Sequence, residues 1–152
     1  MINISLIVRT FVEFNSKKMQ IDFYKYQGTG NDFVMIDNRL EIFPKNTALI
    51  EKLCDRRFGI GGDGLILLEN DTETDFRMVD YNSDGNQSSM CGNGGRCLVA
   101  FAKKLNVIEN STTFIATDGL HHATISADGL VSLQMIDVDA IQTTPEFSFL
   151  NT

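Results

Sequence analysis

Short runs of alternating apolar and polar residues, separated by glycine-rich turns, dominate the chain. Residues 20–26 alternate between two faces with a period of two, which predicts a strand, and residues 33–37 form a second short strand beyond a polar turn. Residues 64–69 and 75–81 are expected to be strands as well, the first as a continuous apolar run. The first half of the chain is therefore built mainly from strands.

One helix is predicted between the second and third of these strands. It covers roughly residues 46–57. Asn46 or Thr47 has a side chain that can cap its N-terminus, and Gly59 can end it.

A second helix is predicted to begin at Cys91 and to end near Asn106. Apolar residues lie on much of its surface, which is typical of a helix buried at the centre of a domain. These residues are Leu98, Val99, Ala100, Phe101, Ala102 and Leu105.

Beyond this helix the chain becomes a meander of short strands. Residues 113–118, 121–126 and 130–137 are strand-like. Asp118-Gly119 and Asp128-Gly129 separate them as hairpin turns. Because strands outnumber helices and tight turns join several of them, we predict an α+β domain in which a curved, largely antiparallel or mixed sheet surrounds the second helix.

Candidate chemistry centres on Cys91, which precedes a glycine-rich turn at the start of the second helix. The unpaired N–H groups of a first helical turn and the positive end of the helix dipole form an anion-binding site. The same field favours the thiolate of Cys91 over its thiol. A carboxylate held beside an activated sulfur suits proton transfer at the neighbouring carbon, so Cys91 is a candidate acid–base residue.

The other two cysteines have a different setting. Cys97 lies on the second helix and Cys54 lies in the apolar segment 49–54, so both are predicted to be core residues. Cys91, by contrast, is followed by the glycine-rich segment 92–95, whose exposed backbone a ligand can approach closely.

Composition narrows the classes of function. The chain has 152 residues, 43% of them hydrophobic, and a net charge of −7, which suits one ordinary domain and argues against a nucleic-acid partner. Three cysteines give no disulfide framework, so a reducing, cytoplasmic setting is expected. We expect no membrane segment and no signal peptide. His121 and His122 point to opposite faces of a predicted strand, so no metal site is expected.

Two asparagines in turns are candidate ligand contacts. Asn31 lies in the polar turn 27–32, and Asn82 begins the turn after residues 75–81. Each amide can donate and accept hydrogen bonds to a zwitterionic ligand, or it can close an Asx turn on its own backbone. The residues alone leave both interpretations open.

Four motifs follow one another along the chain: Gly28-x-Gly30-Asn31-Asp32-Phe33, Asp55-Arg56-Arg57-x-Gly59-Ile60-Gly61-Gly62-Asp63-Gly64, Tyr81-Asn82-x-Asp84-Gly85 and Met90-Cys91-Gly92-Asn93-Gly94-Gly95-Arg96-Cys97. Together they closely resemble the amino-terminal half of the diaminopimelate epimerase family, from about Met19 to the end of the chain. The resemblance implies two similar halves, each with a mixed sheet around a central helix.

The resemblance also implies an activity. Members of the family invert one α-carbon of diaminopimelate without a cofactor, and so interconvert its LL and meso forms for lysine and cell-wall synthesis. One cysteine thiolate removes the α-proton, and a second thiol from the other half delivers a proton to the opposite face. The small-molecule substrate is therefore expected to be diaminopimelate.

Site residues follow from the same resemblance. Cys91 matches the catalytic cysteine of this half. Gly92 and Asn93 match residues that offer backbone N–H groups to the substrate carboxylate. Asn31 and Asn82 match positions that contact the substrate.

The chain departs from the family pattern in two ways. Gly64 stands where many members have a glutamine that contacts the substrate. The chain also ends at Asn151-Thr152, at what resembles the start of the second half, without the partner cysteine or a later glutamate–arginine pair. Cys97 cannot replace that cysteine, because six positions along a helix place it about 9 Å further on and about 240° around.

We divide the chain into an N-terminal extension at 1–18, the amino-terminal domain at 19–138, and a tail at 139–152 that starts a missing second domain. The leading expectation is an isomerase present as its first half, inactive alone, which pairs with a C-terminal half or self-associates through apolar surface that includes residues 147–150. One alternative is a non-catalytic truncated or split-gene fragment that associates with a partner half. Another is a relative of proline or hydroxyproline racemase, which Asn93 disfavours because those enzymes carry histidine there.

Overall fold

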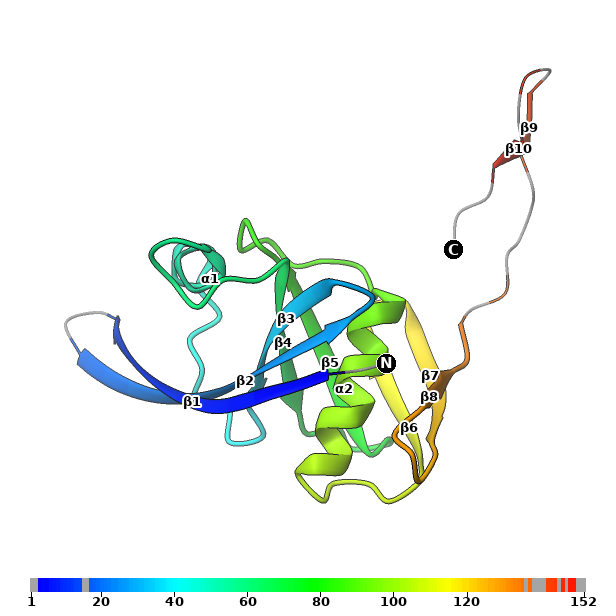
Figure 1. Cartoon of the computed structure of the whole chain (residues 1–152), viewed down its shortest axis with the longest axis horizontal. Helices are drawn as coiled ribbons and strands as arrows, with labels where there is room; N and C mark the ends of the chain where they lie inside the picture. Colours follow the sequence, from blue (N-terminus) through cyan, green and yellow to red (C-terminus); the bar gives the residue numbers. More distant parts are fainter. Residues whose placement is uncertain are drawn as a thin grey trace.

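An eight-stranded sheet curls around one helix in the computed structural model, which describes residues 3–14, 17–135, 137, 142–144, 146 and 148–149 (Figure 1). Its strands are β1 (Asn3–Phe14), β2 (Lys17–Gly28), β3 (Asn31–Asp37), β4 (Gly64–Glu69), β5 (Phe76–Asn82), β6 (Ser111–Ala116), β7 (Gly119–Ile125) and β8 (Val131–Leu133). The helices are α1 (Thr47–Cys54) and α2 (Gly92–Lys104), and β9 (Gln142–Thr143) pairs with β10 (Ser148–Phe149) in a separate two-stranded sheet.

The strands lie side by side in the same order as in the chain. Neighbours are antiparallel except for two parallel pairs, β3 with β4 and β5 with β6. Parallel neighbours need a crossover connection, and the two helices provide it, α1 for the first pair and α2 for the second. The mixed sheet around a central helix confirms the predicted α+β fold.

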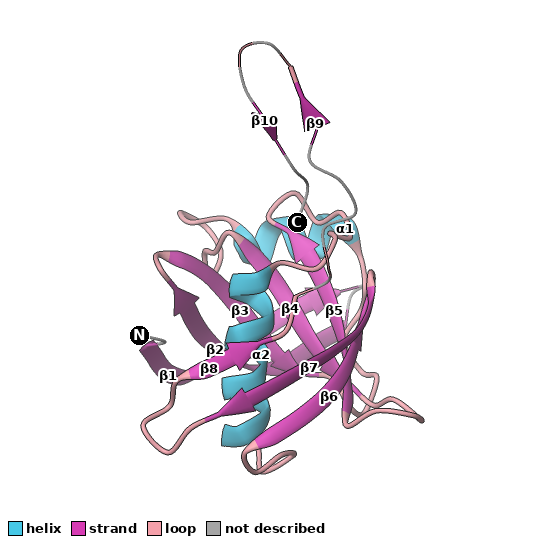
Figure 2. Ribbon diagram, turned by 90° about the vertical axis from the view of Figure 1, so that its right-hand side faces the viewer, coloured by secondary structure: helices cyan, strands magenta, loops and turns pink. Residues whose placement is uncertain are grey.

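Helix α2 lies against the concave face of the sheet, with strands on both sides of it (Figure 2). Its apolar residues pack in one core with side chains from the inner face of the strands, among them Phe33, Ile66 and Phe114. Six of the helix residues in that core are Cys97, Leu98, Val99, Ala100, Phe101 and Ala102. The prediction of a centrally buried helix is therefore confirmed.

Helix α1 covers the opposite face of the sheet and forms a second core. Leu49, Ile50 and Leu53 of α1 pack there with Leu65 and Leu67 of β4. The alternate residues of β4 face α2, so every position of this strand is buried. Burial on both faces explains why β4 is a continuous apolar run in the sequence. Neither helix in the described part of the chain is long and apolar enough to span a membrane.

Several element boundaries differ from the prediction. α1 ends at Cys54 instead of residue 57, because Asp55 has extended backbone (φ −61°, ψ 126°). Segment 3–14, for which no strand is predicted, is β1 and pairs antiparallel with β2. The third strand of the meander ends at Leu133 instead of residue 137. Of the apolar tail segment 147–150, residues 147 and 150 lie outside the described residues.

Candidate active site

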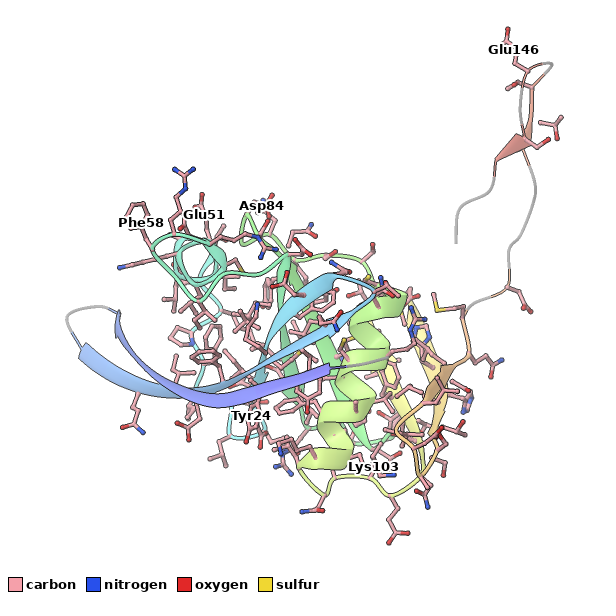
Figure 3. The ribbon with its side chains drawn as sticks, viewed as in Figure 1. Tyr24, Glu51, Phe58, Asp84, Lys103 and Glu146 are labelled. Carbon is pink, nitrogen blue, oxygen red and sulfur yellow. The ribbon has the colours of Figure 1, made fainter. Side chains whose placement is uncertain are left out.

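One end of the sheet gathers the predicted site residues. The parallel strands β3 and β4 begin at this end and the antiparallel β5 finishes there, because Gly64 pairs with both Phe33 and Asn82. Asn31 is the first residue of β3 and Asn82 the last residue of β5. Figure 3 shows the turn after β5, marked by Asp84, and the far end of α2, marked by Lys103, on opposite sides of the molecule.

Cys91 lies next to Asn31 at the start of α2. It is the N-cap residue, with extended backbone (φ −110°, ψ 126°), and its half-buried side chain forms no capping hydrogen bond. Its thiol donates to the Asn31 carboxamide, with Sγ and Oδ1 3.7 Å apart. The Gly95 N–H donates to the Cys91 carbonyl at 2.8 Å, so the N–H groups of Gly92 and Asn93 come before the first intrahelical hydrogen bond.

The glycines after Cys91 serve packing as well as access. Gly92 is half-buried, whereas Gly94 and Gly95 are buried against the sheet. A Cβ atom on Gly94 would lie 2.8 Å from Ile66 Cδ1, and one on Gly95 would lie 2.9 Å from Leu133 Cδ2. The expected close approach of a ligand along 92–95 is therefore wrong for Gly94 and Gly95, which instead let α2 pack closely on the strands.

The two other predicted contacts have defined settings. The Asn93 carboxamide oxygen accepts a hydrogen bond from the Arg96 guanidinium, so the Asn93 side chain is directed along the helix surface. The Asn82 side chain is exposed, while its backbone N–H donates to the Asn86 carbonyl and its carbonyl accepts from Gly85, both at 2.9 Å. The structure brings Asn31 into contact with Cys91, and it holds Asn82 at the same end of the sheet.

A network of charged residues that the sequence does not predict holds Asn31. Asn31 Nδ2 donates to Asp63 Oδ2 at 2.9 Å, and Arg56 bridges Asp63 Oδ1 at 2.8 Å and Asp32 Oδ1 at 2.6 Å. Lys25 Nζ donates to Asp32 Oδ2 at 2.7 Å. Burial alone would raise the pKa of Asp32, but the hydrogen bonds from Arg56 and Lys25 outweigh it and lower that pKa to about 2.

The Asn31 side chain therefore does more than close an Asx turn on its own backbone. It joins two distant segments, the loop at Asp63 and the start of α2 at Cys91. The one feature of the sequence that indicates this network is the presence of charged residues near the glycine motifs. Lys25, Arg56 and Asp63 are charged residues inside or beside glycine motifs, where a purely structural turn would not need them.

The loop after α1 places Asp63. It folds back on the helix, so that the N–H groups of Ile60 and Gly61 donate to the Leu53 carbonyl at 2.8 and 3.0 Å. A Cβ atom on Gly59 would lie 2.0 Å from the Lys52 carbonyl oxygen, so only glycine fits there. Phe58, at the tip of this loop, points away from the body of the molecule (Figure 3). The loop is thus anchored on α1 at its base.

The remaining cysteines are core residues, as predicted. Cys54 belongs to the core under α1 and Cys97 to the core around α2. Burial raises the pKa of the Cys54 thiol to about 11 and that of the Cys97 thiol to about 12. At Gly64 a Cβ atom would lie 2.6 Å from the Tyr81 carbonyl oxygen, so a side chain at this position requires a shift of the backbone.

The adjacent histidines alternate across β7. His121 is buried and His122 is exposed, so their rings lie on opposite faces of the strand. His121 Nε2 lies 2.9 Å from Asp118 Oδ1, so this ring is part of the local structure of the β6–β7 hairpin.

Comparison with solved structures places the fold among known ones. A PhzF-family phenazine biosynthesis protein of Bacillus anthracis superimposes with a TM-score of 0.57 at 16% identity, over 74% of this chain and 39% of the other. A methylitaconate-delta-isomerase gives a TM-score of 0.57 at 14% identity, over 83% of this chain and 66% of the other. At such identities the likeness concerns the fold alone.

Proteins related by sequence are more similar to this chain than these solved structures are. The diaminopimelate epimerase of Flavobacterium psychrophilum is 75% identical over 130 residues, which are 85% of this chain and 51% of that protein. The diaminopimelate epimerase of Acaryochloris marina is 46% identical over 123 residues, 77% of this chain and 44% of that protein. The chain thus spans about half the length of these curated relatives. Because the diaminopimelate epimerase family model matches residues 23–141, this chain belongs to the diaminopimelate epimerase family.

Proposed function

We propose that this chain forms the amino-terminal half of a cofactor-independent diaminopimelate epimerase site, in which Cys91 is the acid–base thiol. The observation that carries the proposal is the half-buried position of Cys91 at the N-terminus of α2, beside the Asn31 amide, in a member of this family. The reaction inverts one α-carbon and interconverts LL- and meso-diaminopimelate, a precursor of lysine and of the cell wall.

The start of α2 suits the carboxylate at the reacting centre. The N–H groups of Gly92 and Asn93 are free of intrahelical partners, and the helix dipole adds a positive potential there. Removal of the α-proton spreads negative charge onto this carboxylate, so preorganised N–H donors stabilise the transition state more than the ground state. Asn31 and Asn82 flank the substrate from the ends of β3 and β5.

Inversion requires an acid and a base on opposite faces of the α-carbon. Among the three cysteines of the chain, Cys54 and Cys97 are buried in the cores, so Cys91 is the one thiol suited to the reaction. We therefore assign the second thiol to a partner half that corresponds to the part of the curated relatives which this chain does not span. A polypeptide of these 152 residues alone is expected not to epimerise diaminopimelate.

A chimeric enzyme tests the proposal. The first half of the Flavobacterium psychrophilum enzyme is replaced by this chain, which is 75% identical to it over 130 residues. Exchange of the substrate α-proton in deuterated water, followed by NMR, measures activity. We expect activity in the chimera and none in the 152-residue polypeptide.

Two substitutions in the chimera separate the thiols. Cys91→Ala is expected to abolish exchange, and Cys54→Ala, which removes a core thiol, is expected to retain it. A chimera with Cys91→Ala that exchanges the α-proton at the unsubstituted rate would refute the role of Cys91. A folded chimera without activity would refute the proposed function of the half.

A further inference from the structure

The Asn31 carboxamide stands between a carboxylate and a sulfur. Its Nδ2 donates to Asp63 Oδ2 at 2.9 Å, and its Oδ1 accepts from the Cys91 thiol at 3.7 Å. An asparagine amide can be turned either way, and its hydrogen-bond partners decide which way it faces. An ionised carboxylate can only accept hydrogen bonds, so the NH2 group must face Asp63 and the oxygen must face Cys91.

Asp63 is itself held in place as an ionised acceptor. Its Oδ2 also accepts the backbone N–H of Asp32 at 3.1 Å, and its Oδ1 accepts from Arg56 at 2.8 Å. The hydrogen bond from Asn31 is the largest of the causes that hold the pKa of the Asp63 carboxyl below its ordinary value. Asp63 is therefore an acceptor throughout the neutral pH range, and the Asn31 amide keeps one orientation.

We propose that Asp63 is a positioning residue for Cys91: its carboxylate turns the Asn31 amide so that an acceptor oxygen faces the sulfur and favours the protonated thiol. This inference rests on the proposed function only in taking Cys91 as the reactive thiol.

The physical reason is the asymmetry of the hydrogen bond. A thiol can donate to the amide oxygen, whereas a thiolate would face the lone pairs of that oxygen without any donor. The start of α2 acts in the opposite sense, because its dipole favours negative charge on sulfur. The Asn31 oxygen thus counteracts the effect of the helix dipole on the Cys91 sulfur. It does so because Asp63 fixes the orientation of the Asn31 amide.

The substitution Asp63→Asn removes this constraint while preserving size. The new amide must place its own NH2 group either against Arg56 or against Asn31 and the Asp32 N–H, all of which are donors. Arg56 keeps its hydrogen bond to Asp32 in both arrangements. Because an amide, unlike a carboxylate, presents a donor on one side, the orientation of Asn31 is no longer fixed, and its amide can flip to direct Nδ2 at the sulfur. The thiolate gains a donor, so alkylation of Cys91 becomes faster.

The experiment is a double-mutant cycle on the second-order rate of Cys91 alkylation by iodoacetamide at pH 7, measured in the 152-residue protein without substrate. Asp63→Asn is expected to raise the rate about fivefold, the effect of one hydrogen bond of ordinary net strength. In an Asn31→Ala background the same substitution is expected to leave the rate unchanged, because the amide through which Asp63 acts is gone.

Controls separate orientation from charge and from misfolding. Glu109→Gln removes one negative charge from an exposed position beyond the other end of α2 and should not change the rate. Asp63→Ser, which leaves Arg56 paired with Asp32, is the second variant if the thermal transition of Asp63→Asn is lost. An increase that persists in the Asn31→Ala background, or no increase in either Asp63 variant, would overturn the proposal. Because no substrate is present, the result is independent of whether the chimera epimerises diaminopimelate.

Discussion

Burial divides the cysteines of this chain into two kinds. Cys54 and Cys97 are 3% and 0% exposed, and burial raises the pKa of each thiol, to about 11 and about 12. The thiolate is the nucleophile, so these two residues are inert at neutral pH, while Cys91 is half-buried at a helix start.

We predict that iodoacetamide modifies Cys91 first in the folded protein at pH 7, by roughly tenfold or more over the other two. Peptide mass spectrometry after timed labelling measures the three rates. In concentrated urea the rates should converge, which serves as the control. Modification of Cys54 or Cys97 ahead of Cys91 in the folded protein contradicts the prediction.

Residue patterns identify Cys91 and Asn31 as candidate site residues. They do not identify Asp63, the hydrogen-bond partner of Asn31. The link from Asn31 to Asp63 depends on the parallel pairing of β3 with β4, which brings the starts of both strands together. Parallel pairing across a helix leaves no local signal in the sequence. Roles for Gly92, Asn93 and Asn82 in substrate binding stay predictions.

Elements with clear boundaries in the sequence agree with the structure. β4 has the predicted bounds, residues 64–69, because a short apolar run between turn residues is typical of a strand buried on both faces. No strand is predicted for β1, and the structure shows it paired antiparallel with β2 over Asn3–Phe14. The end of α1 was placed too late, because the fold-back of the following loop, a tertiary feature, stops the helix.

Gly59 lies in the loop that folds back on α1. In Gly59→Ala the new Cβ atom would lie 2.0 Å from the Lys52 carbonyl oxygen, so the loop that carries Asp63 must move. Gly129→Ala is the matched control: its φ of +84° is unfavourable for alanine, but nothing lies within 4 Å of its Cβ position.

We expect Gly129→Ala to cost about 1 kcal/mol of the free energy of unfolding, the ordinary cost of a left-handed residue, and Gly59→Ala to cost about 3 kcal/mol or more. Urea unfolding monitored by circular dichroism gives both values. Equal costs would show that the loop adapts and that its attachment to α1 is not rigid.

The buried carboxyl of Asp80 makes the free energy of unfolding of the whole molecule depend on pH. Asp80 of β5 is 4% exposed, and burial raises its pKa from 3.8 to about 7, with partial compensation by the Tyr81 backbone N–H. Between these values the folded protein binds a proton that the unfolded chain has released. Stability therefore falls as pH rises from about 4 to 7 and then levels off. Asp32, whose pKa is lowered to about 2, acts below this window and in the opposite direction.

We predict that Asp80→Asn removes this loss. Relative to the variant, the unsubstituted protein should lose on the order of 3 kcal/mol of unfolding free energy between pH 5 and pH 8, because each pKa unit corresponds to about 1.4 kcal/mol. Urea unfolding of both proteins at intervals of pH measures the difference, and groups common to both cancel in it. Asp84→Asn, at an exposed position in the turn after β5, should leave the slope unchanged. Parallel pH profiles for the unsubstituted protein and Asp80→Asn would mean that Asp80 ionises normally in the fold, and that water or a flexible β5 relieves its burial.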